Sequence, residues 1–175
     1  MAVNPCVICG QETPEGRLVC ASCEREVMED REPRVYKFTI YMNPVTKKNS
    51  NQIVRNPRTG RWFIAPSAQY KKYCRECLKQ IMTWTDRPKE PIDFPVNCKY
   101  LFFKETHRLC DDLNHSEAID DILVQAGVLA DDNRDIVANH DGTRILYDKE
   151  RPRVEITITE VFGWERWSDA KNKRK

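Results

Sequence analysis

Residues 108–130, RLCDDLNHSEAIDDILVQAGVLA, decide the fold, because they join the best-defined helix of the chain to a dense group of acidic residues. Gly127 is the residue type that commonly ends a helix. The spacing predicts a core helix that begins near Asn114 and stops at Gly127. Five apolar residues follow the helical period and mark its buried face: Ala118, Ile119, Ile122, Leu123 and Ala126.

Strand patterns lie on both sides of this helix. A second helix is predicted from Ser67, a suitable N-cap, to about Trp84. A turn at 56–60 between two apolar runs predicts a hairpin. Strands and helices interleave, which indicates an α/β (α+β) fold: a mixed β-sheet with two main helices and a small N-terminal zinc-binding module. The strands are expected at 35–42, 96–103, 136–139 and 154–161.

Composition divides the chain into three segments. An acidic run ends at Pro33, so residues 1–33 are expected to form a four-cysteine module and residues 34–163 the main domain. Residues 164–175 end in four basic side chains and predict a mobile basic tail that could touch DNA.

Charge is distributed unevenly, although the net charge is only +2. Residues 35–89 carry 12 basic and 2 acidic side chains, whereas residues 90–160 carry 8 basic and 16 acidic ones. This split suits a protein with one surface that attracts phosphates and another region that holds carboxylates. The alternative, a solvated surface on which charges segregate by accident, stays open on these counts.

Two Cys-x2-Cys pairs near the N-terminus have the spacing of a four-thiolate zinc site. Cys6 and Cys9 form one pair, Cys20 and Cys23 the other, with ten residues between them. Since the protein would supply all four ligands, the zinc is expected to be structural, and its binding should fold the module. Zinc modules of this kind bind nucleic acid or partner proteins, and the acidic charge of this one favours a protein or an intramolecular role.

A third pair, Cys74-x2-Cys77, falls inside the second predicted helix. Side chains three residues apart share a helix face, so core packing explains this pair better than a second metal site. Cys98 and Cys110 are interpreted as isolated thiols.

The core helix also carries an acidic edge. Asn114, Glu117 and Asp121 recur at i, i+3 and i+7, within a sector of about 60°. Oxygen ligands gathered in this way favour Mg²⁺ or Mn²⁺, which activate water in phosphodiester hydrolysis. The alternative is a solvated helix face with acids that favour the helix N-terminus. Further carboxylates flank the helix: Asp111 and Asp112 before it, Asp131 and Asp132 after it.

This register resembles the RusA family of Holliday-junction resolvases. Asp111-x-x-Asn114 leads into the helix, Asp121 follows seven residues after the Asn, and a Gly-containing turn precedes Asp131-Asp132. Lys47-Lys48-Asn49 matches a Lys/Asn element of the family, and the resemblance covers about residues 35–162. The chain departs from the family pattern at two positions. Leu113 stands where members typically have a second Asp, and Glu117 where many have a Lys.

The resemblance implies a Mg²⁺-dependent endonuclease that resolves four-way junctions and other branched DNA, and a homodimer. Asp111 and Asp132 would anchor the metal, and Asp121, Glu117 or Asp112 would complete its coordination shell. The catalytic residues would be Asp111, Asp132, Asp121 and Glu117. Residues expected to contact DNA are Lys47, Lys48, Asn49, Arg58, Arg61, Lys71 and Lys72, together with Arg55.

A second function stays open: a catalytically weak or inactive branched-DNA-binding or adaptor protein whose zinc module recruits a partner. No run approaches the ~20 apolar residues of a membrane span, and the N-terminus lacks the pattern of a secretory signal. We therefore expect a cytoplasmic protein of a bacterial cell; the sequence leaves open whether the host or a phage or prophage encodes it. His115 adjoins the acidic group as a weak candidate ligand for a metal or phosphate, while His107 and His140 are interpreted as hydrogen-bonded surface or turn residues.

Overall fold

The computed structural model describes residues 4–13, 17–24, 31–47 and 51–172, apart from the side chains of residues 112 and 170–172. The chain forms two compact units, Met1–Arg34 and Val35–Lys175. In the described part of the chain, no helix has the length and apolar character that a membrane crossing requires.

The first unit is built around cysteine. Strand β1 (Asn4–Pro5) pairs antiparallel with β2 (Glu12–Thr13), and residues 21–24 are helical. Its buried cluster consists of Cys6, Cys20 and Cys23 with Val19 against them. A core this small cannot fold a segment by hydrophobic burial alone, so the unit requires another source of folding free energy.

The second unit contains a five-stranded mixed sheet. Its order is β3 (Val35–Ile40), β9 (Arg153–Glu160), β6 (Val96–Lys104) and β7 (Val137–Asn139), with β8 (Arg144–Tyr147) also on β6. Strand β9 is antiparallel to both neighbours, whereas β7 and β8 run parallel to β6. Side chains of β6 and β9 alternate between buried and half-buried, so one face of the sheet forms the core.

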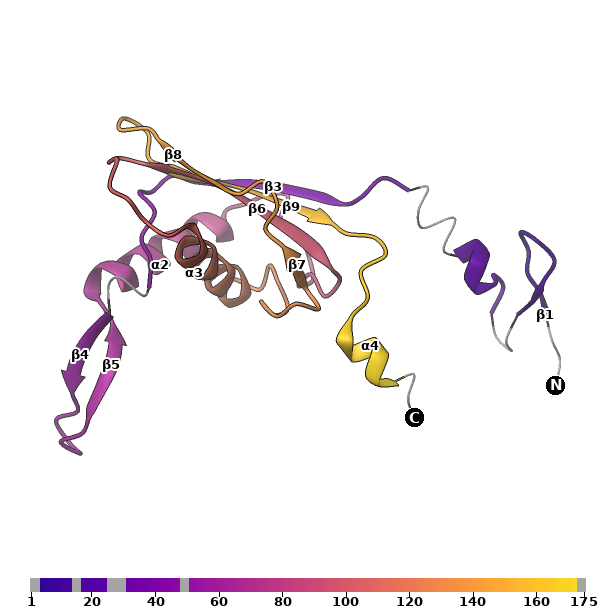
Figure 1. The fold of residues 1–175 in the computed structure, drawn as a ribbon, viewed down its shortest axis with the longest axis horizontal. Coiled ribbons are helices and arrows are strands. Elements are labelled where there is room, and N and C mark those ends of the chain that lie inside the picture. Colours follow the sequence, from indigo (N-terminus) through magenta and orange to yellow (C-terminus); the bar gives the residue numbers. More distant parts are fainter. Residues whose placement is uncertain (1–3, 14–16, 25–30, 48–50, 173–175) are drawn as a thin grey trace. The chain divides into compact units, whose positions relative to one another are not determined.

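Two long helices, α2 (Ala68–Met82) and α3 (Asp112–Gln125), cover this face of the sheet (Figure 1). Ser67 caps α2 as predicted, since its side chain accepts a hydrogen bond from the Tyr70 N–H at 3.1 Å. The helices bury Tyr73, Cys77 and Ile81 from α2, and Ile119, Ile122 and Leu123 from α3. The predicted mixed sheet with two main helices is confirmed.

The structure differs from the sequence expectation at three places. Helix α3 begins two residues before Asn114, because the Asp111 side chain accepts a hydrogen bond from the Leu113 N–H at 3.0 Å. Strand β8 was not expected. Residues 167–172 of the expected mobile tail form helix α4 (Trp167–Asn172), whose first N–H groups donate to the Asp135 carboxylate at 2.7 and 3.0 Å.

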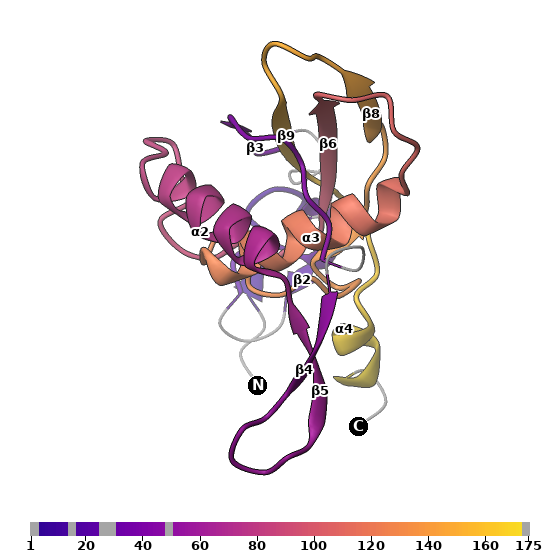
Figure 2. The same ribbon diagram turned by 90° about the vertical axis from the view of Figure 1, so that its left-hand side faces the viewer.

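A hairpin extends from this body (Figure 2). Strands β4 (Asn51–Arg55) and β5 (Trp62–Pro66) pair with each other and form a separate two-stranded sheet. We call residues 51–66 the arm. Its turn lies at 56–60, where the sequence predicted it.

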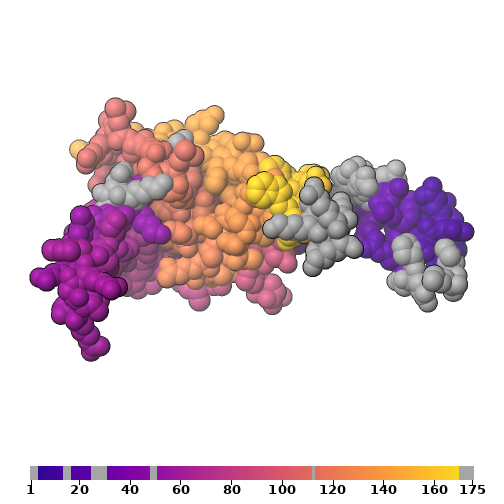
Figure 3. Space-filling model, turned by 60° about the horizontal axis from the view of Figure 1, so that its bottom comes forward, coloured from indigo at the N-terminus to yellow at the C-terminus, as the bar shows by residue number. Residues whose placement is uncertain are grey.

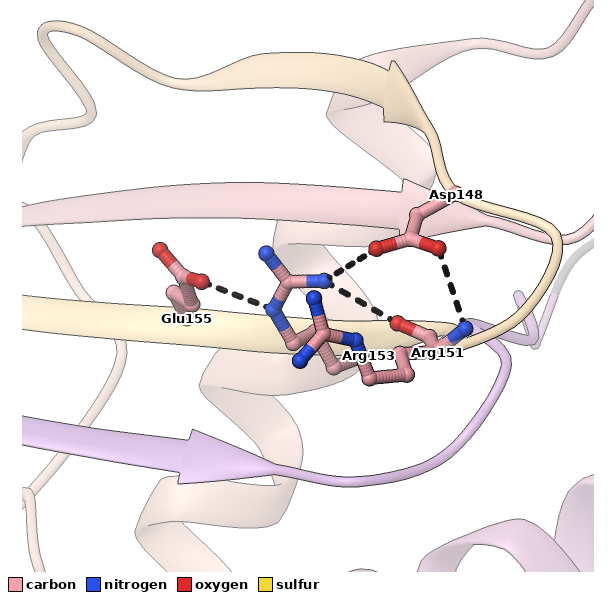
Figure 4. A network of polar contacts seen from close by, with 4 residues as sticks. All are labelled: Asp148, Arg151, Arg153 and Glu155. Carbon is pink, nitrogen blue, oxygen red and sulfur yellow. Dashed lines mark hydrogen bonds and ion pairs between the residues drawn. The ribbon is translucent and has the colours of Figure 1, made fainter.

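An arginine network fixes the connection between β8 and β9 (Figure 4). Arg153 donates to Asp148 at 2.8 Å and to Glu155 at 2.7 Å, and its guanidinium lies 3.5 Å from the centre of the Phe103 ring. Asp148 also accepts from the Arg151 N–H at 3.0 Å. Since both partners of Arg153 are carboxylates, the network neutralises charge that the acidic half of the chain places here.

Candidate active site and metal centre

A pocket of about 290 Å³ brings together part of the predicted acidic site. Helix α3 supplies three of its polar side chains, because Asn114, Glu117 and Asp121 share one edge of that helix. Asp132 enters from the loop that follows α3, and Lys47 from the segment after β3. The pocket is lined by Lys47, Asn51, Asn114, Glu117, Ala118, Asp121 and Asp132.

Asp111 is connected to the pocket indirectly. As the N-cap of α3 it accepts from the Leu113 N–H, and the Asn114 side-chain amide donates to its other oxygen at 2.9 Å. The cap thereby orients Asn114, which lines the pocket. The side chain of Asp112, also predicted as a ligand, lies outside the described residues, while Leu113 is exposed.

Lys47 forms an ion pair inside the pocket. Its ammonium lies 2.8 Å from the Asp121 carboxylate. The hydrogen bond to Asp121 raises the pKa of Lys47, and Asp132 adds a smaller contribution in the same direction. The positive charge therefore offsets repulsion between carboxylates that come from different segments of the chain.

The paired aspartates after α3 have opposite environments. Partial burial raises the pKa of Asp132, and the neighbouring carboxylates of Asp131 and Asp121 add to the effect. Hydrogen bonds from the Asn133 side chain, at 2.6 Å, and from the Asp132 N–H lower the pKa of Asp131. Asp131 thus stabilises the turn, whereas Asp132 faces the pocket with a carboxylate that a cation would stabilise.

The carboxylates of this pocket are spread apart. Within the described residues, the one group of three or more potential ligands that lie within 4.8 Å of one another is the four cysteines. The pocket therefore has an oxygen donor set that suits Mg²⁺ or Mn²⁺, in an arrangement wider than a closed coordination shell.

Basic side chains predicted to contact DNA occupy two elements. Arg58 and Arg61 lie in and next to the turn of the arm, and Lys71 and Lys72 are exposed on the first half of α2. Lys48 and Asn49 lie outside the described residues. A second pocket, of about 490 Å³, adds Lys104 and Arg108 near the start of α3.

A buried polar network under α3 was missed by the sequence analysis. Asp120, directly before Asp121, is buried and accepts from the Tyr100 hydroxyl at 2.5 Å, while His140 Nε2 lies 2.9 Å from its other oxygen. Burial raises the pKa of Tyr100, which keeps the hydroxyl protonated as a donor. The helical period could have predicted that Asp120 is buried, because this residue lies on the same helix face as the core residues Ile119 and Leu123.

The other histidines have structural contacts. His115 is buried, with Nδ1 2.8 Å from the Asp111 carbonyl oxygen and its ring 5.2 Å from that of Phe102. His107 stacks on Tyr147 with ring centres 3.7 Å apart.

The four N-terminal cysteines lie close together and could bind a metal. Cys9 Sγ is 3.5 Å from Cys20 Sγ, too far for a disulfide bond. The Cys20 N–H donates to Cys6 Sγ at 3.2 Å, and this bond, together with bonds from the backbone of Cys9 and Ile8, lowers the pKa of Cys6 to about 6. These hydrogen bonds favour a thiolate, which is the form that binds metal.

The remaining cysteines show no comparable group in the described part of the chain. Cys77, on α2, is buried in the hydrophobic core, and burial raises its pKa to about 12. Cys74 is half-buried on the same helix, and Cys98 is buried on β6. The core-packing interpretation of the Cys74 and Cys77 pair agrees with these positions.

Comparison with known proteins assigns no family. No protein-family model matches the chain, and no curated protein matches it at a significant level.

Proposed function

We propose that this chain is a Mg²⁺- or Mn²⁺-dependent endonuclease that cuts branched DNA, four-way junctions above all, by phosphodiester hydrolysis. The observation that carries the proposal is the pocket that gathers Asn114, Glu117, Asp121 and Asp132 from one helix edge and the following loop. The RusA-like register of these residues in the sequence supports the same function.

The donor set fits a hard divalent cation. Glu117, Asp121 and Asp132 would hold the ion through carboxylate oxygens, and Asn114 would add an amide oxygen. The bound ion would supply Lewis acidity and an activated water for attack on phosphorus. Asp111 would act indirectly, because it caps α3 and accepts a hydrogen bond from the Asn114 amide that lines the pocket.

Lys47 prepares the pocket electrostatically. With its ammonium on Asp121, it offsets part of the repulsion between the Asp121 and Asp132 carboxylates that line the same pocket. It also places a cation where a DNA phosphate would approach the acidic residues, which reduces the repulsion between the two.

Phosphate binding would use the basic side chains around the pocket. The arginines of the arm and the exposed lysines of α2 provide positive charge on two elements. Such contacts position a DNA backbone without reading its sequence, so affinity should fall steeply with salt. As a homodimer, the protein would present two such pockets to the two symmetric strands of a junction.

We further propose that the first unit binds a structural zinc ion through Cys6, Cys9, Cys20 and Cys23. A tetrahedral ion with Zn–S bonds of about 2.3 Å needs sulfurs about 3.8 Å apart, and the group is compact enough to provide this. Zinc would supply the folding free energy that the small cysteine core lacks.

A binding-only function is the second candidate. Its support is the spread of the carboxylates, the ion pair between Lys47 and Asp121, and an exposed Leu113 where the RusA pattern has an aspartate. In that case the chain would bind branched DNA and use the zinc unit to recruit a partner.

Cleavage of a synthetic four-way junction tests the proposal, with duplex, flap and single-stranded DNA beside it. Symmetric nicking with Mg²⁺ or Mn²⁺ is expected for the parent, with a loss of at least 100-fold in Asp132→Asn. Asp86→Asn is the control, because it removes one carboxylate outside the pocket. Tight junction binding without cutting in either ion would refute hydrolysis and favour the binding-only function.

A further inference from the structure

The arm exposes five large apolar side chains on a two-stranded ribbon. Its strands pair only with each other in the described chain, and Figures 2 and 3 show it standing out from the rest of the second unit. Ile53 is 74%, Ile64 71% and Trp62 68% exposed, and Val54 and Phe63 are exposed as well. An isolated two-stranded ribbon is marginally stable in water, so these side chains suit a surface that is covered when the protein functions.

The strand register sorts the side chains onto two faces. Ile53 lies opposite Ile64, and Arg55 opposite Trp62, so these four share one face of the ribbon. The other face carries Val54 opposite Phe63. The first face therefore combines three large apolar side chains with a guanidinium in one continuous strip.

Charge decides what kind of partner fits this strip. Residues 51–66 contain three arginines and no acidic residue. Two arms that paired with each other would bring six guanidinium groups together, which opposes self-association through this surface. A nucleic acid fits both features, because its backbone is anionic and its unpaired bases offer flat apolar faces.

Several hydrogen bonds hold the turn of the arm, next to its arginines. The Asn56 side chain accepts hydrogen bonds from the N–H groups of Arg58 and Thr59 at 2.9 and 3.2 Å. Gly60 has a φ of +68°, which a side chain would strain. Arg55 donates to the Gly60 carbonyl at 3.1 Å and so closes the tip.

The base of the arm belongs to the acidic pocket. Asn51, the first residue of β4, lines that pocket with Asn114, Asp121 and Asp132. Five residues of strand span roughly 17 Å, which is about five base-pair steps of DNA. A DNA strand bound at the pocket would therefore lie within reach of the strip on the first face of the arm.

We infer that the arm is a wedge for unpaired DNA bases: Trp62, with Ile53 and Ile64 beside it, stacks on bases exposed at a branch point, while Arg55, Arg58 and Arg61 contact the flanking phosphates. The inference deepens the proposed function, because it assigns the recognition of branches to a defined element. It concerns binding and does not require the pocket to hydrolyse DNA.

Binding in Mg²⁺-free buffer, reached by dialysis without chelator so that the cysteine unit keeps its zinc, tests the wedge separately from cleavage. The probes are a fluorescein-labelled four-way junction, a fork with unpaired arms, and a duplex of the same length. Trp62→Ala is expected to weaken binding to the junction and the fork about 10-fold, as loss of one base-stacking contact would. Duplex binding should change less than 2-fold. Trp62→Phe, which keeps an aromatic face, should restore most of the affinity.

A second readout reports stacking directly. With 2-aminopurine placed at the branch, the parent should change its fluorescence on binding, and Trp62→Ala should abolish this change at saturating protein. Because Trp62 is exposed, the variant should unfold at the parent's temperature. Equal losses for branched and duplex DNA would overturn the wedge, and so would a shift from dimer to monomer caused by Trp62→Ala. A parent that binds but never cuts would refute only the nuclease proposal.

Discussion

Removal of the Asp120 carboxylate should destabilise the second unit strongly, although the residue lies outside the pocket. Asp120 is buried and holds the Tyr100 hydroxyl and the His140 ring at 2.5 and 2.9 Å. In Asp120→Ala the fully buried Tyr100 hydroxyl loses its acceptor, which costs about 1–3 kcal/mol, and the bond to His140 is also lost. We expect a loss of about 3 kcal/mol, or a fall in Tm of about 6–12 °C.

Urea unfolding followed by tryptophan fluorescence measures this loss. All four tryptophans lie in the second unit, so the signal does not depend on the cysteine unit. Tyr100→Phe should cost about 1.5 kcal/mol, and the double variant should cost clearly less than the sum of the two. Additive losses, or a loss below about 1 kcal/mol for Asp120→Ala, would show that the network does not clamp α3 to β6.

Three further predictions follow from other contacts. One zinc ion per chain should be released on titration with a thiol-modifying reagent, and Cys20→Ser should bind less than the parent; unchanged zinc content in that variant would contradict the four-thiolate site. Arg153→Met should destabilise the second unit by about 1–2 kcal/mol at pH 7. Hydrogen bonds from the Arg151 N–H and from Arg153 lower the pKa of Asp148. The part of the lost stability that comes from this ion pair should therefore be present above the unfolded carboxyl pKa of about 3.9, and it should vanish as pH falls through the lower folded pKa. A loss of stability that does not depend on pH would refute the ion pair as its source. Burial raises the pKa of Asp132, so the folded state gains stability as pH falls through that folded pKa. Asp132→Asn should therefore raise Tm slightly at pH 7, and it should abolish any increase in Tm caused by Mg²⁺. A lower Tm in this variant would show that the charged carboxylate does not destabilise the folded state.

Local patterns were sufficient for much of the fold. The helical period of Ile119, Ile122 and Leu123 predicted α3, and Ser67 marked the start of α2, because these signals depend on neighbours within one or two turns. The same register placed Glu117 and Asp121 on one edge, where the structure has them. Strand β8, with four residues and no clear alternation of burial, carries no comparable local signal.

Contacts between distant segments could not be predicted in the same way. Lys47 was expected on the DNA backbone, and its contact with Asp121, 74 residues away, depends on how the segment after β3 passes α3. His140 meets Asp120 only because β7 lies beside β6. The exposed strip of the arm also required the strand register, since its apolar run suits a buried strand equally well.

The two proposed metal sites make EDTA alone a poor test of mechanism. Four thiolates bind zinc with about 10–16 kcal/mol, whereas an open pocket of oxygen ligands holds Mg²⁺ far more weakly and retains several waters. A strong chelator would thus unfold the cysteine unit while it also removes the ion from the acidic pocket. Dialysis without chelator, followed by addition of Mg²⁺, separates the two sites, because only the weak site empties. Cleavage that returns with Mg²⁺ in Cys20→Ser would assign hydrolysis to the second unit alone, whereas loss of cleavage with intact junction binding would make the cysteine unit part of the active nuclease.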